Sequence, residues 1–369
     1  MKQRLDSLTS SRFLAALFVA IHHTLANWAH TPAVDAVGRV GWLGVPYFFI
    51  LSGFVLMWSF DNGTSKALFI WKRLARIYPL HIVCLITSLM TFVTFGTPFG
   101  GYIGTVRGTL ANFLLIHDWL PHHPEVRQAW NGVSWTLSCE LFFYLIAPWL
   151  FSRMLRESSV KRLLAAIAAC YLYLLAFALL AARAHSSRTS DLLFYWPPPH
   201  LLEFSLGALG AMLIRRGWRF QSIPLSIASM IIPIIYCTLT PGLAKADAVM
   251  LLLFIPGAFL LIISLACREI GQGASILTKK RLVFLGEASY ALYMTHAIFL
   301  GMFTYALVHV FSISYLSPFW GELTTAIYLC LAVGISALAH RHFEVPAKIW
   351  LLKLHLRRSP TLRETRVST

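Results

Sequence analysis

Ionisable side chains lie inside strongly apolar stretches of this 369-residue chain at four places, and they are the first candidates for chemistry. They are Arg12 and His23 in one stretch, Glu140 in a second, Glu287 and His296 in a third, and Glu203 at the start of a fourth. A charged group costs at least about 2.5 kcal/mol at the centre of a bilayer, so such residues are seldom kept there without a function or a partner. An imidazole near carboxylate and guanidinium groups is suited to proton transfer beside an anionic substrate.

The stretches that carry these residues have the length of membrane-spanning helices. Hydrophobic residues make up 57% of the chain and charged residues only 12%, about half the charged share of a soluble protein. Segments of about 20 apolar residues, enough to cross a bilayer, recur along the sequence. We predict ten spans, at residues 13–31, 41–60, 78–96, 133–152, 162–182, 199–214, 223–241, 247–267, 283–305 and 320–340. The predicted fold is an all-α polytopic bundle in a lipid bilayer.

The basic residues predict the orientation of this bundle. The chain has 31 Lys and Arg against 15 Asp and Glu, a net charge of +16 that would suggest a nucleic-acid partner in a soluble protein. Sorted by the predicted topology, 24 of the 31 lie on the side of the two termini and six on the other side. Because Lys and Arg of short loops prefer the cytoplasm, we predict cytoplasmic termini and no nucleic-acid partner.

We expect one transmembrane domain over residues 1–346 and a basic cytoplasmic tail over residues 347–369 that rests on anionic lipid. The first span is expected to stay uncleaved, because Arg12 at its start does not suit a signal peptide. The long interruption at residues 97–132 is expected to hold a re-entrant or interfacial helix on the outer side. All six cysteines fall within predicted spans, so no disulfide framework is expected.

The depths of the ionisable residues indicate a shared chamber. At 1.5 Å per residue, His23 and Glu140 lie about 10 Å below the outer ends of their spans and His296 about 8 Å below. This coincidence predicts a polar chamber in the outer third of the membrane, with Arg12 closer to the cytoplasm. Glu203 lies near the outer boundary of the sixth span.

Six sequence strings then appear in a characteristic order: RLDSLTSSRFLAALFVAIHH, GVPYFFILSGFVL, FIWKRLARIYPLH, SWTLSCELFFY, FLGEASYALYMTH and HFEVP. With them, residues 4–346 resemble the acyltransferase-3 family, bacterial membrane-bound O-acyltransferases that act on envelope sugars. The resemblance implies delivery of an acyl group, commonly acetyl from cytoplasmic acetyl-CoA, to a carbohydrate hydroxyl at the outer face. The family's pattern of Arg, ten residues and His falls on Arg12 and His23. Its Arg-x-x-Arg pattern falls on Arg73 and Arg76.

These expectations assign catalytic roles to three residues. His23 is the predicted general base for the sugar hydroxyl, although the adjacent His22 is an alternative. Glu140, if it faces His23, would fix its tautomer and stabilise the imidazolium, as the acid of a catalytic triad does. Arg12 would hold donor phosphates or the mouth of a donor channel; its alternative role is to snorkel to the inner interface. Direct transfer is preferred, with an acyl-histidine intermediate as the competing mechanism.

Binding roles are expected for two further groups. Arg73 and Arg76, in a predicted loop with Lys72, suit coenzyme A phosphates, unless they serve only as topology charges. Ser52, beside Gly53, would allow close backbone approach along a narrow donor passage. The expected acceptor contacts are His296, Glu203 and Trp135. His296 could instead form a hydrogen bond between two helices, and Trp135 could instead belong to the interfacial aromatic belt.

The predicted function is therefore a multi-pass O-acyltransferase of the bacterial inner membrane. Its partners would be acyl-CoA as co-substrate and a polysaccharide or lipid-linked oligosaccharide as acceptor, with no permanently bound cofactor and no metal site. Matched polar residues in ten helices also fit a transporter or flippase of lipid-linked sugars, although no inverted halves can be recognised. A sensor or assembly subunit of a polysaccharide export machine is a third possibility. Release of free coenzyme A would distinguish the enzyme from both.

Overall fold

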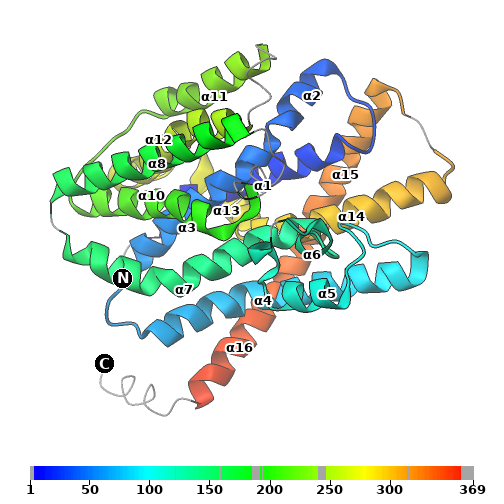
Figure 1. Ribbon diagram of the computed structural model, residues 1–369, viewed down its shortest axis with the longest axis horizontal. Helices are drawn as coiled ribbons and strands as arrows, with labels where there is room; N and C mark the ends of the chain where they lie inside the picture. The colour runs from blue at the N-terminus through cyan, green and yellow to red at the C-terminus, as the bar shows by residue number, and fades with distance from the viewer. Residues whose placement is uncertain are drawn as a thin grey trace.

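The computed structural model describes residues 4–120, 122–157, 159–184, 192, 194–239, 247–313 and 316–358. Over these ranges the fold is all-α, and the only β-type pairing is an isolated bridge between Tyr102 and Ala129. Figure 1 shows the long helices gathered into one bundle around α1 (Asp6–Thr24). The all-α prediction is confirmed for the part of the chain that the structure describes.

Ten described helices have 16 or more residues, one for each predicted span. Besides α1 they are α3 (Gly44–Ser59), α4 (Lys66–Phe95), α7 (Trp135–Arg156), α8 (Val160–Ala184), α10 (Pro197–Arg215), α11 (Ile223–Leu239), α12 (Asp247–Gln272), α14 (Ser289–His309) and α15 (Pro318–Ala339).

Six helical segments of the described chain are long and apolar enough to cross a membrane. They are Pro32–Ser59, Lys66–Phe95, Gly132–Arg156, Val249–Gly271, Ser289–His309 and Pro318–His355. The chain is therefore a multi-pass membrane protein. The full count of ten spans and the side of the termini stay predictions.

Shorter helices complete the fold: α2 (Pro32–Arg39), α5 (Val106–Phe113), α6 (Pro124–Arg127), α13 (Lys280–Glu287) and α16 (Val345–Arg358). The expected helix in the 97–132 interruption corresponds to α5, which carries exposed Val106 and Leu110. Helix α16 occupies the first part of the segment that was assigned to the tail, and residues 359–369 lie outside the described residues.

Helix α4 begins at Lys66, well before the predicted start at residue 78. The side chain of Ser65 caps it by accepting a hydrogen bond from the Leu68 N–H at 3.2 Å. Pro79 lies inside the helix, where it removes one backbone hydrogen bond without ending the helix. Arg73 and Arg76 therefore lie on a helix rather than in the predicted loop, so their side chains have fixed directions.

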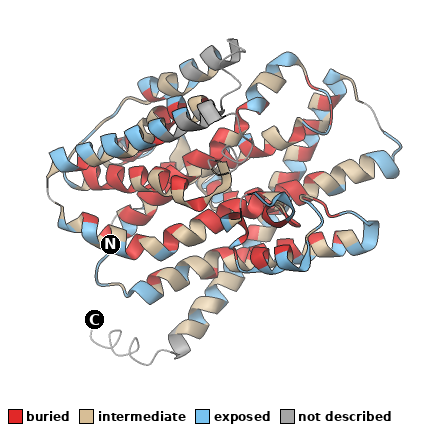
Figure 2. Cartoon of the chain, in the orientation of Figure 1, coloured by how far each residue is buried: buried red, intermediate tan, exposed pale blue. Residues whose placement is uncertain are grey.

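Close backbone contacts hold the centre of the bundle together. A Cβ atom on Gly53 of α3 would lie 1.8 Å from the carbonyl oxygen of Phe204 in α10, and one on Gly207 would lie 1.8 Å from that of Ile50. Buried residues are concentrated along α3, α7 and α10 (Figure 2). These glycines set the close crossing of α3 and α10, because only hydrogen atoms fit between the backbones.

Helix α1 is fixed at its N-terminus by a buried carboxylate. Glu269 of α12 accepts hydrogen bonds from the backbone N–H of Asp6 at 2.7 Å and of Ser7 at 2.8 Å. A carboxylate at this position satisfies otherwise unpaired N–H groups and complements the helix dipole. Glu269 therefore helps to set the position of the helix that carries Arg12 and His23.

Candidate active site

Three cavities follow one another along α1. We call them the arginine cavity, about 970 Å³, the middle cavity, about 50 Å³, and the histidine cavity, about 470 Å³. Arg12 and Arg76 line both the arginine and the middle cavity. Val45 and Tyr293 line both the middle and the histidine cavity. The shared walls make the three cavities a series with its narrowest part in the middle.

The arginine cavity is lined by five cationic side chains: Arg4, Arg12, Arg76, Arg215 and Lys348. Three carboxylates also line it: Glu287 pairs with Arg4 at 2.6 Å, Glu344 accepts a hydrogen bond from His340 at 2.8 Å, and Asp61 is exposed. Among the described residues, no carboxylate lies within ion-pairing distance of the three cations Arg12, Arg76 and Lys348. Five cations against three carboxylates therefore leave the lining of this cavity with a net positive charge.

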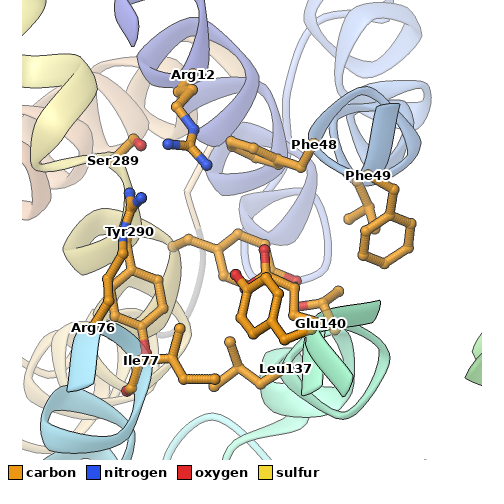
Figure 3. A pocket seen from close by; sticks show the side chains of 13 residues that line it. Arg12, Phe48, Phe49, Arg76, Ile77, Leu137, Glu140, Ser289 and Tyr290 are labelled. Atoms are coloured by element: carbon orange, nitrogen blue, oxygen red, sulfur yellow. The ribbon is translucent and has the colours of Figure 1, made fainter. Parts of the chain in front are cut away.

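The middle cavity brings Arg12 of α1 and Arg76 of α4 close to Glu140 of α7 (Figure 3). The hydroxyl of Tyr144, one helical turn after Glu140, donates to its Oε2 at 2.7 Å. Glu140 is also near enough to Arg12 to interact with it electrostatically. Glu140 is thus held by the Tyr144 hydroxyl in a cavity that both arginines also line.

The histidine cavity is lined by His22 and His23 of α1 and by aromatic rings that include Trp135 and Tyr195. The rings of Trp135 and Tyr195 pack edge to face, with centroids 5.2 Å apart. Part of its wall is backbone, because Gly100 and Gly101 also line it. A wall of flat rings and exposed peptide groups is suited to a sugar-like molecule with apolar faces and hydroxyl edges.

His296 of α14 lies directly behind His23. Its Nε2 is 3.2 Å from Nδ1 of His23, and the two rings are 5.0 Å apart in a T-shaped arrangement. His296 is completely buried and lines none of the three cavities. The shared depth predicted for His23 and His296 thus corresponds to a direct contact, whereas Glu140 lies in another cavity.

The structure separates some residues that were expected to act together. In the described part of the chain, no hydrogen bond joins Glu140 to His23. Counting residues along the helices predicted the depth of each side chain in the membrane but not the direction in which it points. Glu203 is buried beside His200, whose Nδ1 lies 3.3 Å from its Oε2, away from the cavity series. Trp135 lies in the wall of the histidine cavity.

Of the residues predicted to bind the donor, some line the cavities and others do not. Arg76 lines two cavities, and Arg73 is oriented over the ring of Phe69, 5.3 Å from its centroid. Lys72 is exposed on α4 and lines none of the three cavities. Ser52 is buried beside the Gly53 contact with α10 and is also absent from the cavity walls. These two residues have no contact with the cavity series.

Two residues of the site were not among the predicted ones. Tyr144 holds Glu140, and its position four residues later on a helix is the signal that could have indicated the pair. Lys348 reaches the arginine cavity from α16, just after a π-helix over His340–Glu344. The spacing of His340, Glu344 and Lys348 at intervals of four places them on one helical face, but α16 had been assigned to the tail.

A separate buried polar cluster lies in the 97–132 segment. His117 and Asp118 are fully buried, with His117 Nε2 and Asp118 Oδ2 3.2 Å apart but without hydrogen-bonding geometry. Burial raises the pKa of Asp118 well above its usual value, although the charge of Arg127 opposes this change. Burial also lowers the pKa of His117 to about 3, so this ring is neutral.

The fold and its cavities define a class, a multi-pass membrane protein with a polar passage inside the helix bundle. The family model described as "Acyltransferase domain" matches residues 5–341, so the chain belongs to this acyltransferase family. The resemblance to the acyltransferase-3 family is thereby confirmed, and the chain is a membrane enzyme that transfers acyl groups.

Several relatives agree with this assignment. The chain is similar to "Acyltransferase MdmB" of Streptomyces mycarofaciens, with 33% identity over 79% of this chain and 78% of the relative. It is similar to "O-acetyl transferase" of Shigella phage Sf6, with 24% identity over 63% of this chain and 70% of the relative. It is also similar to "O-acetyltransferase OatA" of Staphylococcus aureus, with 23% identity over 94% of this chain and 59% of the relative. No solved structure matches the chain.

Proposed function

We propose that the protein is an O-acyltransferase that takes an acyl group, most simply acetyl, from cytoplasmic acyl-CoA. The acceptor is a hydroxyl of an exopolysaccharide, lipid-linked oligosaccharide or related envelope glycan at the outer face of a bacterial inner membrane. The observation that carries this proposal is the series of cavities, with cations that lack carboxylate partners at one end and imidazoles at the other.

The arginine cavity is the proposed donor site. Coenzyme A carries several phosphate groups, and arginine binds phosphate through paired N–H groups while lysine acts as a point charge. Arg12, Arg76 and Lys348 offer such groups, and none of the three lies within ion-pairing distance of a carboxylate among the described residues. The preference of basic residues for the cytoplasm supports a cytoplasmic position for this end, the side where acyl-CoA is made.

The middle cavity is the proposed passage for the pantetheine arm. Its volume of about 50 Å³ admits a thin chain but not the nucleotide, which would stay in the arginine cavity. Arg12, on the wall of both cavities, would hold the donor at the entrance. The thioester at the end of the arm would then approach His23 through the wall formed by Val45 and Tyr293.

His23 is the proposed general base for the transfer. As the hydroxyl oxygen of the sugar attacks the thioester carbonyl carbon, the imidazole takes the hydroxyl proton. The carbon–sulfur bond then breaks, the thiolate leaves, and the imidazolium returns the proton to it. The products are an acyl ester of the sugar and free coenzyme A. This direct route needs no acyl-enzyme intermediate, and an acyl-histidine is the competing route.

The histidine cavity is the proposed acceptor site. Trp135 and Tyr195 would stack against the apolar faces of a sugar ring, and exposed peptide groups of Gly100 and Gly101 would meet its hydroxyl groups. The one arginine in its wall, Arg39, is on the exposed rim and would meet a negative group on the acceptor or its lipid carrier.

The test compares cells that carry the intact chain, His23→Ala or no chain, with each protein quantified in the membrane fraction. We expect acyl groups on the surface glycan to be lost in the last two. The purified intact protein should release free coenzyme A from acetyl-CoA when given glycan from cells that lack the chain. Movement of a lipid-linked sugar without coenzyme A release would instead identify a transporter, and unchanged acylation in the deletion would contradict the proposed acceptor.

A further inference from the structure

The backbone of α14 fixes the protonation of the His296 ring. Its Nδ1 lies 2.7 Å from the carbonyl oxygen of Tyr293 and 3.2 Å from that of Leu292. A carbonyl oxygen can only accept a hydrogen bond, so Nδ1 of His296 must carry the hydrogen. In the neutral ring the other nitrogen, Nε2, then has a free lone pair and acts as an acceptor.

This lone pair and the Val19 carbonyl together fix the tautomer of His23. Nδ1 of His23 lies 3.2 Å from Nε2 of His296 and 2.9 Å from the carbonyl oxygen of Val19. Both neighbours are acceptors, so Nδ1 of His23 carries a hydrogen that it shares between them. The basic lone pair of His23 is therefore on Nε2. His23 lines the histidine cavity, so the base belongs to the compartment of the proposed acceptor.

We propose that His296 is a positioning residue for the base, which fixes the reactive tautomer of His23 and accepts a hydrogen bond from its imidazolium. This inference rests on the proposed function, in which His23 takes the hydroxyl proton. It gives His296 the task that a carboxylate has in a Ser-His-Asp triad. Glu140 is not available for this task, because it lines the middle cavity and accepts a hydrogen bond from Tyr144.

A neutral partner suits this position better than a carboxylate. His296 is completely buried among helices of the bundle, where an ionised carboxylate would pay a large desolvation penalty whenever His23 is neutral. A neutral imidazole avoids this penalty and stabilises the imidazolium less strongly than an anion does. His23 can consequently pass its proton on to the leaving thiolate within the same turnover.

The rival explanation is that His296 only joins α1 to α14 through a hydrogen bond. A joining role predicts that loss of the imidazole lowers stability and spares the chemical step in the protein that remains folded. A positioning role predicts a lower kcat at an unchanged KM for acetyl-CoA, together with rescue by a residue that restores the acceptor. The hydroxyl of Tyr328 of α15, which donates to the carbonyl oxygen of His296 at 2.8 Å, offers a control that disturbs another helix contact of the same residue without touching His23.

The experiment uses the full chain in nanodiscs, with acetyl-CoA and glycan from cells that lack the chain, and measures ester formation and coenzyme A release. His296→Phe keeps a ring but removes the hydrogen-bond acceptor, and we expect kcat to fall about 100-fold. This loss is smaller than the roughly 10⁴-fold loss for a wrong tautomer, because the Val19 carbonyl still accepts a hydrogen bond from Nδ1 of His23. His296→Gln, with an amide oxygen as acceptor, should stay within about tenfold of the intact protein. Tyr328→Phe should keep kcat.

The outcomes separate the two proposals. If the intact protein forms no ester, the proposed function itself fails. If the intact protein is active and His296→Phe keeps its kcat, or if His296→Gln is no better than His296→Phe, the positioning role is wrong. A measurement on the intact fold does not depend on these variants: ring-nitrogen NMR, with His23→Gln to assign the signal, should show the hydrogen of neutral His23 on Nδ1. A hydrogen on Nε2 would overturn the proposal.

Discussion

Replacing Val45 by phenylalanine is expected to close the passage between the middle and histidine cavities. Val45 lines both, at the narrowest part of the series. The middle cavity has about 50 Å³, room for about four water molecules. Phenylalanine adds about four carbon atoms to the side chain, enough to fill this space. The thioester would then stop short of His23, and a displacement of about 1 Å already costs about 100-fold in rate.

The assay measures two steps on the same purified protein. Acyl transfer to glycan from cells that lack the chain should fall at least about 100-fold in Val45→Phe, which is about 2.7 kcal/mol in the barrier. Binding of acetyl-CoA should be unchanged, because Val45 does not line the arginine cavity. This combination of retained binding and lost transfer is specific to a blocked passage.

Val55→Phe is the matched control. Val55 lies on the same helix and lines only the arginine cavity, where about 970 Å³ leaves room for a larger side chain. It should bind acetyl-CoA and keep most of its transfer activity. Full activity of Val45→Phe would refute a route through the middle cavity. Equal losses in both variants would show that the helix, rather than the passage, is sensitive to the added ring.

Three further predictions concern separate parts of the chain. Arg76→Gln should raise KM for acetyl-CoA about tenfold, because the donor loses about one charge-assisted hydrogen bond. Arg162→Gln, a change outside the cavities, should leave KM unchanged. Equal KM values for the two variants would show that Arg76 does not belong to the donor site. Glu269→Ala should lower the free energy of unfolding by about 2–3 kcal/mol, because the N-terminal N–H groups of α1 lose their acceptor. Thermal unfolding in detergent should then begin at a lower temperature, and an unchanged midpoint would contradict this. Burial raises the pKa of Asp118 in the folded protein, so its ionisation opposes folding above the unfolded pKa of about 3.9. Asp118→Asn should therefore gain stability over the intact protein as the pH rises towards neutrality, and a gain that is independent of pH would show that Asp118 does not titrate in this way.

The apolar runs of the sequence were sufficient to locate the long helices, because a helix in a membrane needs a minimum number of consecutive apolar residues. It was insufficient at α4, where Pro79 was interpreted as a boundary although the helix passes through it. One missing backbone hydrogen bond is a local cost, and tertiary packing of Ala75, Ile77 and Leu80 outweighs it. Helix α16 lies beyond the predicted domain boundary and contacts α4, where Trp71 Nε1 donates to the Leu351 carbonyl oxygen at 3.3 Å.

The sequence predicted those features of the site that depend only on the depth of a residue in the membrane. Residue counting placed His23 and His296 at one level, and the two rings are in contact there. Counting along a helix gives the height of a residue but not its rotation about the axis. Glu140, predicted at the same level, is instead held by Tyr144 in the middle cavity. A carboxylate was expected behind the base, and the structure has an imidazole in that position.

Helix α1 links the two ends of the proposed reaction. Arg12 and His23 are eleven residues apart, a rise of about 16 Å along the axis. Arg12 lies where the arginine cavity meets the middle cavity, and His23 lies in the wall of the histidine cavity. The spacing of the two residues therefore sets how far the reactive end of a donor must reach from its anionic end. A Cβ on Gly44 would lie 2.7 Å from the Ala15 carbonyl oxygen, so α3 packs closely against α1 between these two residues. The axial distance between Arg12 and His23 thus defines the length that the donor must span between its phosphates and its thioester.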